Sequence, residues 1–236
     1  MEKNLTSNYK WWSCQRHVLV NLRKTIDQIL KSHLNLMPGQ KVVDIGCGDK
    51  PYELIFKEYG CRYLGCDLDG VANIRIKEGE KISIPDKSAD GIVSFQVLEH
   101  VWDLNWYLGE CKRILKNDGW LLLSTHGSWL YHPHPTDYRR WTRDGLVKEL
   151  EERSFKVKNV FAVVGPLALT TQYRLLGIYL FLKKIPLFGP ILLFPITIFM
   201  NLLMSFEDLI TPTSFKETNA CVYVTVSYKT NTLKSI

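Results

Sequence analysis

The sequence predicts an α/β fold in which helices cover a parallel sheet, and three observations predict it. Short apolar runs typical of buried strands alternate with amphipathic helical stretches through the first two thirds of the 236 residues. The length suits one domain with a full hydrophobic core. A composition of 46% hydrophobic and 23% charged residues is that of a folded globule and excludes disordered, collagen-like and coiled-coil classes.

The expected elements follow from periodicity and from helix and turn signals. A helix over residues 16–35 ends before Pro38 and Gly39. A turn is expected at Asn117, Asp118 and Gly119, between a helix and a strand. Along the chain we expect strand 41–45, helix 52–59, strands 62–66 and 90–95, helix 103–116, strand 120–125, a helix capped by Thr142 and running to about 153, strand 155–164 and a β-branched final strand 220–228.

Charge and cysteine usage give few constraints on partners. The net charge of +6 is a mild excess that does not call for nucleic acid as a partner. The six cysteines show no CxxC pair and no Cys/His spacing of a zinc site, and the first residues lack the pattern of a secretory signal. A reducing cytoplasm is the expected compartment.

The turn after the first strand is the first candidate ligand site. Ligands of open parallel sheets bind beyond the carboxyl ends of the strands. Here Gly46 and Gly48 permit a sharp turn and a close approach of backbone to ligand. Asp67 follows the next strand, where a carboxylate can accept hydrogen bonds from both hydroxyls of a ribose. The arrangement predicts a nucleoside ligand.

The identity of the nucleoside depends on the charges and on one missing glycine. A dinucleotide-binding loop has a third glycine that brings the helix N-terminus to a pyrophosphate, and Pro51 occupies that position. Asp44 and Asp49 would repel phosphates and suit an ammonium and a sulfonium group. The pattern favours S-adenosylmethionine and disfavours a nicotinamide oxidoreductase.

Four segments, VVDIGCGDKP, YLGCDLD, IPDKSADGIVSFQVLEHV and LKNDGWLLLST, resemble the successive motifs of class I S-adenosylmethionine-dependent methyltransferases, in family order over residues 41–125. The resemblance implies a Rossmann-like, seven-stranded, mostly parallel sheet with an antiparallel last strand. It also implies cofactor-binding roles: Asp44, Gly46, Cys47 and Gly48 for the methionine end, Asp67 for the ribose, Leu68, Glu78 and Gly79 beside the adenine, and Gln96 near the methyl group.

The loop after the fifth expected strand is the candidate acceptor side. Methyl transfer from a sulfonium needs mainly a collinear approach, and a hydroxyl acceptor also needs a base. We expect His132 or His134 as that base, assisted by Asp137. Metal binding by His126, His132 and His134 is the alternative, but no cysteine or spaced carboxylate pair completes a set, so no metal is expected.

The HPxDYxRWTxxGL part of this loop resembles methyltransferases of cell-envelope glycan pathways. Acceptor-binding roles are assigned to Tyr138, Arg140 and Trp141 of this loop and to His100 after the fourth strand, although an Asp137–Arg140 pair and an aromatic wedge could equally serve to fix the loop. For Glu99 and His100, ordering the turn after the fourth strand is the competing interpretation.

An uncharged segment, residues 185–206, lies between the last two expected strands. It is long enough to span a membrane, but three prolines and a glycine divide it, and it connects strands of one sheet. The alternatives are broken helices that enter one leaflet, a lid over the acceptor, or a homodimer interface. The nearby Trp11 and Trp12 lie among basic residues and support the membrane interpretation; these are Lys3, Lys10, Arg16, Arg23 and Lys24.

The sequence thus predicts a helical cap over residues 1–40, a methyltransferase domain over 41–164 and 218–236, and a hydrophobic insertion over 165–217. The leading function is O-methylation of a sugar in a cell-envelope glycan or its lipid-linked precursor, in the cytoplasm at the inner face of the membrane. The alternatives are a methyltransferase of a quinone or other lipophilic molecule and a non-catalytic membrane scaffold.

Overall fold

The computed structural model describes residues 9–230, and these form two compact units. One unit comprises the described residues up to Gln28 with Gly127–Leu130 and Phe161–Tyr223, and we call it the helical unit. The other comprises Ile29–His126, Tyr131–Val160 and the described residues from Val224, and we call it the sheet unit. Of the residues considered from sequence, Lys3 and the outer ends of the expected cap and domain lie outside the described range.

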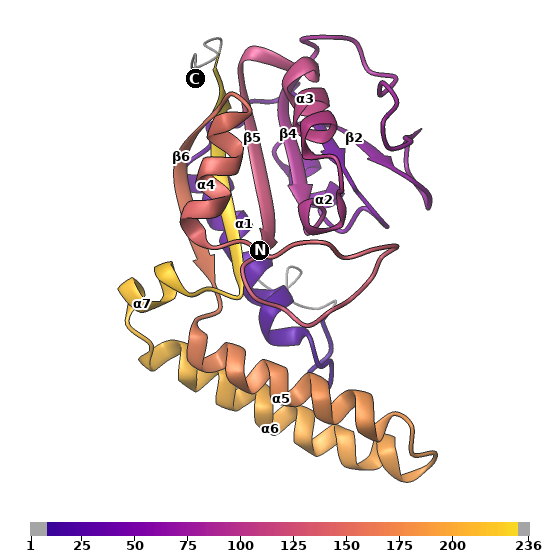
Figure 1. The fold of residues 1–236 in the computed structure, drawn as a ribbon, viewed down its shortest axis with the longest axis vertical. Helices are drawn as coiled ribbons and strands as arrows, with labels where there is room; N and C mark the ends of the chain where they lie inside the picture. Colours follow the sequence, from indigo (N-terminus) through magenta and orange to yellow (C-terminus); the bar gives the residue numbers. More distant parts are fainter. Residues whose placement is uncertain (1–8, 231–236) are drawn as a thin grey trace. The chain divides into compact units, whose positions relative to one another are not determined.

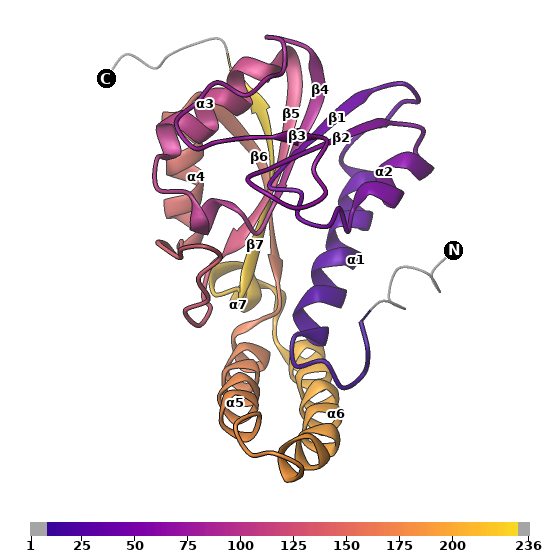
Figure 2. The same cartoon turned by 90° about the vertical axis from the view of Figure 1, so that its right-hand side faces the viewer.

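A seven-stranded sheet has the order β3-β2-β1-β4-β5-β7-β6 (Figure 1). Neighbours β1 and β2, β1 and β4, β2 and β3, and β4 and β5 pair in parallel, and β7 at the end of the chain runs antiparallel (Figure 2). The predicted mostly parallel sheet is confirmed. Its strands are β1 Lys41–Ile45, β2 Arg62–Asp67, β3 Ile74–Arg75, β4 Ala89–Phe95, β5 Leu115–His126, β6 Phe155–Val163 and β7 Val222–Lys229.

The centre of the sheet is buried because its strands are continuous apolar runs. Ile92, Val93 and the three leucines Leu121, Leu122 and Leu123 are fully buried. Such runs are typical of strands covered on both faces. Because β1, β2 and β4 run parallel, the loops that follow them all lie at one edge of the sheet, at the carboxyl ends of the strands.

Helices cover both faces of this sheet. Within the sheet unit, α3 (Leu104–Ile114) and α4 (Arg143–Glu152) lie on one face and α2 (Glu53–Glu58) on the other (Figure 2). The predicted cap of α4 is present, since the Thr142 side chain accepts a hydrogen bond from the Gly145 amide at 3.1 Å. Asp103 caps α3 in the same way. A 3₁₀ turn, η2 (Leu98–His100), follows β4.

Two strand features differ from the expectation. The turn expected at residues 117–119 lies inside β5, where the pairing moves from Ala89 with Leu115 to Gly91 with Trp120. The residues between Leu115 and Trp120 therefore form a bulge within β5. Asn117, Asp118 and Gly119 lie in this bulge and not in a turn between two elements. Strand β3 has two residues, which is too short for periodicity to reveal.

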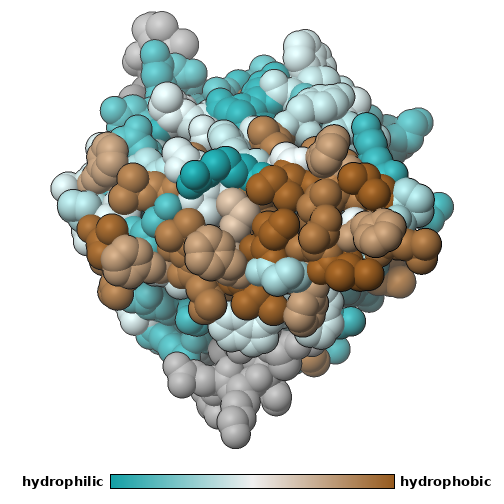
Figure 3. All heavy atoms as spheres, turned by 90° about the horizontal axis from the view of Figure 1, so that it is seen from below, coloured by the Kyte–Doolittle hydropathy of each residue, from teal (hydrophilic) through white to brown (hydrophobic). Residues whose placement is uncertain are grey.

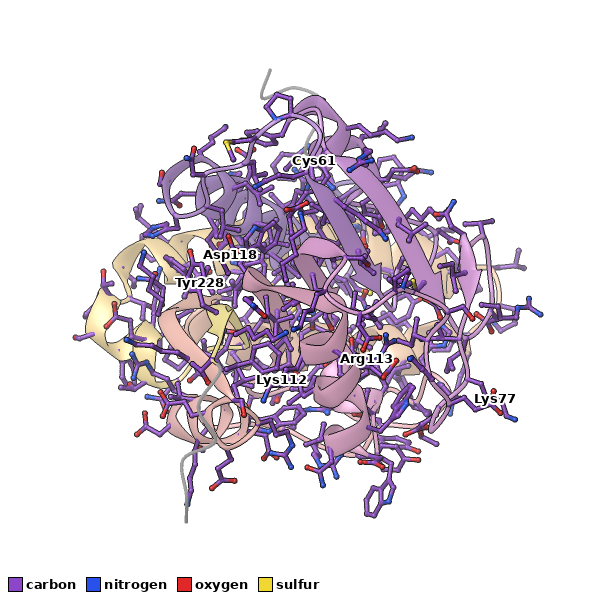
Figure 4. All side chains as sticks on the ribbon, turned by 90° about the horizontal axis from the view of Figure 1, so that it is seen from above. Cys61, Lys77, Lys112, Arg113, Asp118 and Tyr228 are labelled. Carbon is purple, nitrogen blue, oxygen red and sulfur yellow. The ribbon has the colours of Figure 1, made fainter. Side chains whose placement is uncertain are left out.

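Arg113 on α3 fixes the loop that precedes β4 (Figure 4). Its guanidinium makes a bidentate ion pair with Glu110 at 2.6 and 2.7 Å and bonds Asp86 at 2.6 Å. The same group donates to the carbonyl oxygens of Ile82 and Ile84. This cluster anchors the segment that carries Glu78 to the helix beside it.

The helical unit contains the first turns of α1 (Arg16–Ser32) together with α5 (Pro166–Leu182), α6 (Phe188–Ile210) and α7 (Thr213–Thr218). The predicted hydrophobic insertion between the sixth and seventh strands is thus helical, and α5 and α6 lie side by side (Figures 1 and 2). His17 on α1 pairs with Asp208 on α6 at 2.6 Å. By length and composition α6 alone among the described helices could cross a membrane.

Candidate functional site

The turn after β1 is built from two glycines in left-handed backbone conformations. Gly46 has φ +84°, and a Cβ there would lie 2.3 Å from Val97 Cγ2, so no larger residue fits. Gly48 has φ +48°, and a Cβ there would stand in open space. The first glycine lets the turn pack against the loop after β4, and the second leaves the backbone accessible to a ligand.

Asp67, at the end of β2, meets this turn. Its Oδ2 accepts a hydrogen bond from the Gly48 amide at 2.6 Å and its Oδ1 accepts one from the Leu68 amide at 2.7 Å. A carboxylate has about four acceptor positions, so both oxygens keep capacity for ligand hydroxyls. The two amides hold the carboxylate in place before any ligand binds.

A cavity of about 450 Å³ opens at this edge of the sheet unit. Its size is that of pockets that hold small ligands. Its ionised lining is acidic, from Asp49, Asp67, Asp69 and Glu78, and the described lining contains no lysine or arginine. The remaining lining residues are Ile45, Gly46, Gly48, Leu68, Gly70, Ile76, Gln96, Val97, His100, Val101, Trp106, Tyr107, His134, Pro135 and Thr136.

Six of the nine residues assigned to the cofactor from sequence line this cavity, and three do not. Gly46, Gly48, Asp67, Leu68, Glu78 and Gln96 line it, whereas Asp44, Cys47 and Gly79 do not. Gln96 has a left-handed backbone with φ +57°, and its side-chain amide donates to Ser124 Oγ at 3.0 Å. A strained non-glycine residue at a strand end is typical of functional sites.

Asp44 lies beneath the turn and is only 1% exposed. Its Oδ2 accepts a hydrogen bond from the Tyr63 hydroxyl at 2.5 Å. Burial raises the pKa of Asp44, the Tyr63 hydrogen bond lowers it and the nearby Asp67 raises it, and together these effects bring the pKa to about 7. The hydrogen bond from Tyr63 holds Asp44 on the buried side of the turn.

Cys47, which belongs to the turn after β1, is also buried. A Cβ on Gly65 of β2 would lie 2.7 Å from its Sγ, so the thiol packs directly against that glycine. Burial and the neighbouring Asp44 raise the pKa of Cys47 to about 12. The thiol therefore stays protonated at neutral pH and is not a nucleophile.

Two histidines reach the cavity on its acceptor side, His134 and His100. His100 Nδ1 bonds the backbone carbonyl of Thr136. Because a carbonyl oxygen only accepts, Nδ1 carries the proton in the neutral imidazole, and Nε2 keeps a lone pair. Sequence reasoning placed His100 among acceptor-binding residues; the structure adds the tautomer that a general base requires.

The other predicted catalytic residues, His132 and Asp137, do not line the cavity. Arg140 binds Asp137 through two hydrogen bonds of 2.6 Å, and His132 Nδ1 lies 3.3 Å from the same carboxylate. Burial alone would raise the pKa of Asp137, but hydrogen bonds from Arg140 and the His132 amide hold it well below its ordinary value. This is the Asp–Arg pair that fixes the loop.

Tyr138 and Trp141, both assigned to the acceptor, also lie outside the cavity lining. Trp141 is 6% exposed, whereas Tyr138 is 43% exposed. The Tyr138 ring lies 5.2 Å from that of Trp102, and the Arg139 guanidinium lies 5.1 Å from the Trp102 ring. These exposed groups form an aromatic surface, defined here by Trp102, Tyr138 and Arg139.

A buried polar cluster lies behind these residues. Glu99 is fully buried and accepts a hydrogen bond from Thr125 Oγ1 at 2.8 Å, while its Oε1 lies 3.4 Å from His126 Nε2. Burial raises the pKa of Glu99 to about 7 and lowers that of His126. Ligand atoms of Glu99, His100 and His132 lie within 4.8 Å of one another, a grouping that sequence reasoning did not assemble.

Sequence reasoning missed several lining residues. Asp69 is the last residue of YLGCDLD and Gly70 follows it directly, so both were within reach of that signal. Trp106 and Tyr107 lie on α3, where the helical periodicity marks Tyr107 as a core residue and gives no signal for the half-buried Trp106. Tyr107 is buried, and its hydroxyl donates to the Ile45 carbonyl at 3.1 Å, which fixes the end of β1.

Comparison with known proteins places this geometry among methyltransferases. A family model described as a methyltransferase domain matches residues 14–157. A probable S-adenosylmethionine-dependent methyltransferase of Mycolicibacterium smegmatis is 30% identical over 142 residues, which are 53% of this chain and 55% of that protein. A ubiquinone biosynthesis O-methyltransferase of Bradyrhizobium sp. is 29% identical over 107 residues, 39% of this chain and 42% of that protein.

Solved structures share the fold over most of the chain. Geranyl diphosphate C-methyltransferase from Streptomyces coelicolor A3(2), solved with S-adenosyl-L-homocysteine, covers 90% of this chain and 78% of its own, with a TM-score of 0.56 and 12% identity. The chain spans about half the length of the curated relatives it matches.

Proposed function

Because the chain belongs to the class I S-adenosylmethionine-dependent methyltransferase family, we propose that it is an enzyme that transfers the methyl group of S-adenosylmethionine to a hydroxyl of a sugar. The sugar belongs to a cell-envelope glycan or its lipid-linked precursor. The reaction takes place on the cytoplasmic side of the membrane, with the protein associated peripherally.

The acidic cavity after β1 and β2 is the observation that carries this proposal. Four carboxylates line it, and they favour a ligand with an ammonium and a sulfonium over one with a pyrophosphate. Asp67, held by two backbone amides, is placed to accept the ribose hydroxyls, and Gly48 leaves room for the ligand beside the turn. The cofactor supplies an electrophilic methyl group, and the protein supplies its position.

His100 is the group best supported as general base. It lines the cavity, and its bond to the Thr136 carbonyl leaves Nε2 available to take a proton from an acceptor hydroxyl. His134 lines the same cavity and is the second candidate. His132, which does not line it, is better suited to holding the loop through Asp137.

The aromatic surface of Trp102, Tyr138 and Arg139 supports a sugar as the acceptor. Exposed aromatic rings beside a guanidinium present both a stacking face and hydrogen-bond donors, which the faces and hydroxyls of a sugar can use. A quinone is the alternative acceptor, and two observations favour it. Several curated relatives are ubiquinone biosynthesis O-methyltransferases, and Ile45, Val97 and Val101 give the cavity an apolar wall.

The test is a radiolabelled methyl-transfer assay with membrane extracts as the source of acceptor. Label that enters a lipid phase and becomes water-soluble after mild acid hydrolysis identifies a lipid-linked sugar. Label that stays with the lipid phase identifies a quinone or another lipophilic acceptor. Absence of transfer while S-adenosylhomocysteine still binds would contradict catalysis and leave a scaffold.

The role of His100 is tested in the same assay with an alanine variant. We expect His100→Ala to lower turnover by about a hundredfold or more, the range typical of a lost general base, without loss of S-adenosylhomocysteine binding. His33→Ala, outside the cavity, is the matched control. Unchanged turnover in His100→Ala together with loss in His134→Ala would move the role to His134.

A further inference from the structure

A second cavity, of about 270 Å³, lies within the helical unit between α1 and α6. None of its lining residues belongs to the candidate active site. The residues are Trp11, Arg16, His17, Val20, Asn21, Lys24, Asn201, Ser205 and Asp208. We refer to it as the α1–α6 pocket.

Asn201 gives this pocket a buried acceptor without a partner. The residue is 2% exposed, and its Nδ2 donates to the carbonyl oxygens of Trp11 and Ser13 at 3.1 and 3.2 Å. Because carbonyls only accept, these bonds fix which end of the amide is the oxygen. Oδ1 is buried and has no partner among the described residues, so the pocket offers an acceptor to a ligand hydroxyl.

The charges of the pocket favour an anion. Arg16 and Lys24 line it, and neither makes an ion pair with a described carboxylate. The Arg16 guanidinium lies 4.0 Å from the centre of the Trp11 ring and donates to the Tyr9 carbonyl, which holds it in place. Asp208, the carboxylate of the lining, is already bound by His17 at 2.6 Å and by the Gly165 amide at 2.7 Å.

The helix that supplies Asn201 and Ser205 also carries an exposed apolar face. Thr197, Met200 and Met204 are buried on one side of α6, and Asn201, Ser205 and Asp208 occupy the side that faces the pocket. The helical period of 3.6 residues places a third set of α6 side chains beside the pocket side, where they are exposed to solvent. We call this set the apolar stripe: Phe188, Ile191, Leu192, Phe199, Leu202, Phe206, Leu209 and Ile210.

Figure 3 shows the apolar stripe as part of a continuous hydrophobic band bordered by hydrophilic residues. Leu209 is 82% exposed and Leu202 54% exposed, which is unusual for side chains of a core helix. Trp12 lies 5.7 Å from Phe194 at the edge of the band, with Lys10 near its ring. Amphipathic aromatics with basic neighbours are typical of the membrane interface.

We propose that the α1–α6 pocket holds the headgroup of an anionic phospholipid that carries a free hydroxyl, while the apolar stripe lies in the acyl region of the same leaflet. Arg16 and Lys24 bind the phosphodiester, and Asn201 Oδ1 accepts the hydroxyl. The polar side of α6 then faces headgroups, as in a helix that lies in the interface plane. The proposal deepens the peripheral membrane association proposed above and assigns the lipid class.

The experiment measures binding of the full chain to vesicles by flotation, without methyl donor or acceptor. Three compositions are compared: phosphatidylcholine alone, phosphatidylcholine with phosphatidylglycerol, and phosphatidylcholine with an equal fraction of phosphatidic acid. Phosphatidylglycerol offers a phosphodiester and alcohol hydroxyls, whereas phosphatidic acid offers a phosphomonoester without a headgroup alcohol. We expect the tightest binding to phosphatidylglycerol, and tightest binding to phosphatidic acid would overturn the headgroup assignment.

Two variant pairs separate the pocket from general attraction. Lys24→Gln is expected to weaken binding to phosphatidylglycerol vesicles about fivefold, beyond the effect of Lys31→Gln on the same helix but outside the pocket lining. Leu209→Gln is expected to weaken binding to every vesicle, whereas Leu54→Gln, at another highly exposed leucine, on α2, is not. Thermal unfolding of each variant verifies that it folds.

The outcomes distinguish this proposal from the proposed function. If vesicle binding follows the expected pattern but the separate methyl-transfer assay shows no transfer, the results support the headgroup assignment of the α1–α6 pocket and contradict the proposed methyltransferase function. Lys24→Gln no weaker than Lys31→Gln would overturn the pocket. A stable dimer in sedimentation that fails to bind any vesicle would show that the apolar stripe is covered by a second copy of the chain.

Discussion

Glu99 shows how one buried side chain makes the stability of the protein depend on pH. Its carboxyl is fully buried beside Thr125 and His126, and burial raises its pKa to about 7. In the unfolded chain the carboxyl has a pKa near 4.3. Between these two values the unfolded state releases a proton that the folded state keeps, so this group's contribution to stability falls as the pH rises from about 4 to 7.

Glu99→Gln removes this dependence and keeps an oxygen to accept from Thr125. Relative to the parent protein, we expect the variant to gain stability as the pH rises from 4 to 8, by roughly 4 kcal/mol at most. Urea unfolding at a series of pH values measures the difference. Parallel stability curves for the two proteins would show that Glu99 ionises normally in the folded state.

At the scale of elements, glycine is required in the turn after β1 but is replaceable in helix α3. A Cβ on Gly46 would lie 2.3 Å from Val97 Cγ2, and its φ of +84° is unfavourable for alanine. Gly109 on α3 has nothing within 4 Å of a Cβ and is exposed. The same substitution at the two positions therefore separates a required glycine from a replaceable one.

Gly46→Ala is expected to destabilise the protein by about 2 kcal/mol or more and to weaken S-adenosylhomocysteine binding. Gly109→Ala is expected to stabilise it by up to about 1 kcal/mol, because alanine favours the helix. Thermal unfolding and calorimetric titration measure both effects. Adding Val97→Ala to Gly46→Ala relieves the contact, and no recovery in the double variant would show that the contact is not the cause.

The elements were largely predictable because their signals are local. Short stretches rich in apolar and β-branched residues revealed β1, β2 and β4, and Thr142 marked the start of α4. The bulge in β5 was not predictable, since Asn117-Asp118-Gly119 is also a turn sequence and only pairing with β4 reveals it. Strand β3 has no periodicity to detect.

The candidate site was predictable for residues that line the cavity because they directly follow the end of a strand. Gly46, Gly48 and Asp67 line the cavity because they follow strand ends. Depth was not predictable for Asp44, which lies beneath the turn. The Asp137–Arg140 pair was one of two alternatives that the sequence left open, and the structure contains it. Spacing along a loop does not tell which side chains face inward, so His132 and His100 could not be separated from sequence.

At the scale of the whole molecule, the two units carry two different surfaces. All lining residues of the active-site cavity belong to the sheet unit, and all those of the α1–α6 pocket belong to the helical unit. The chain thus separates the groups suited to a cationic nucleoside from those suited to an anionic headgroup.

The measurement that tests the account most directly is calorimetric titration of the full chain with S-adenosylhomocysteine, with NADH as the comparison ligand. We expect saturable binding of S-adenosylhomocysteine and none of NADH, whose pyrophosphate would meet the acidic lining. Asp67→Ala is expected to weaken binding at least tenfold, because the ribose hydroxyls lose the carboxylate that accepts their hydrogen bonds. Binding of NADH in place of S-adenosylhomocysteine, or an unchanged affinity in Asp67→Ala, would contradict the assignment of this cavity.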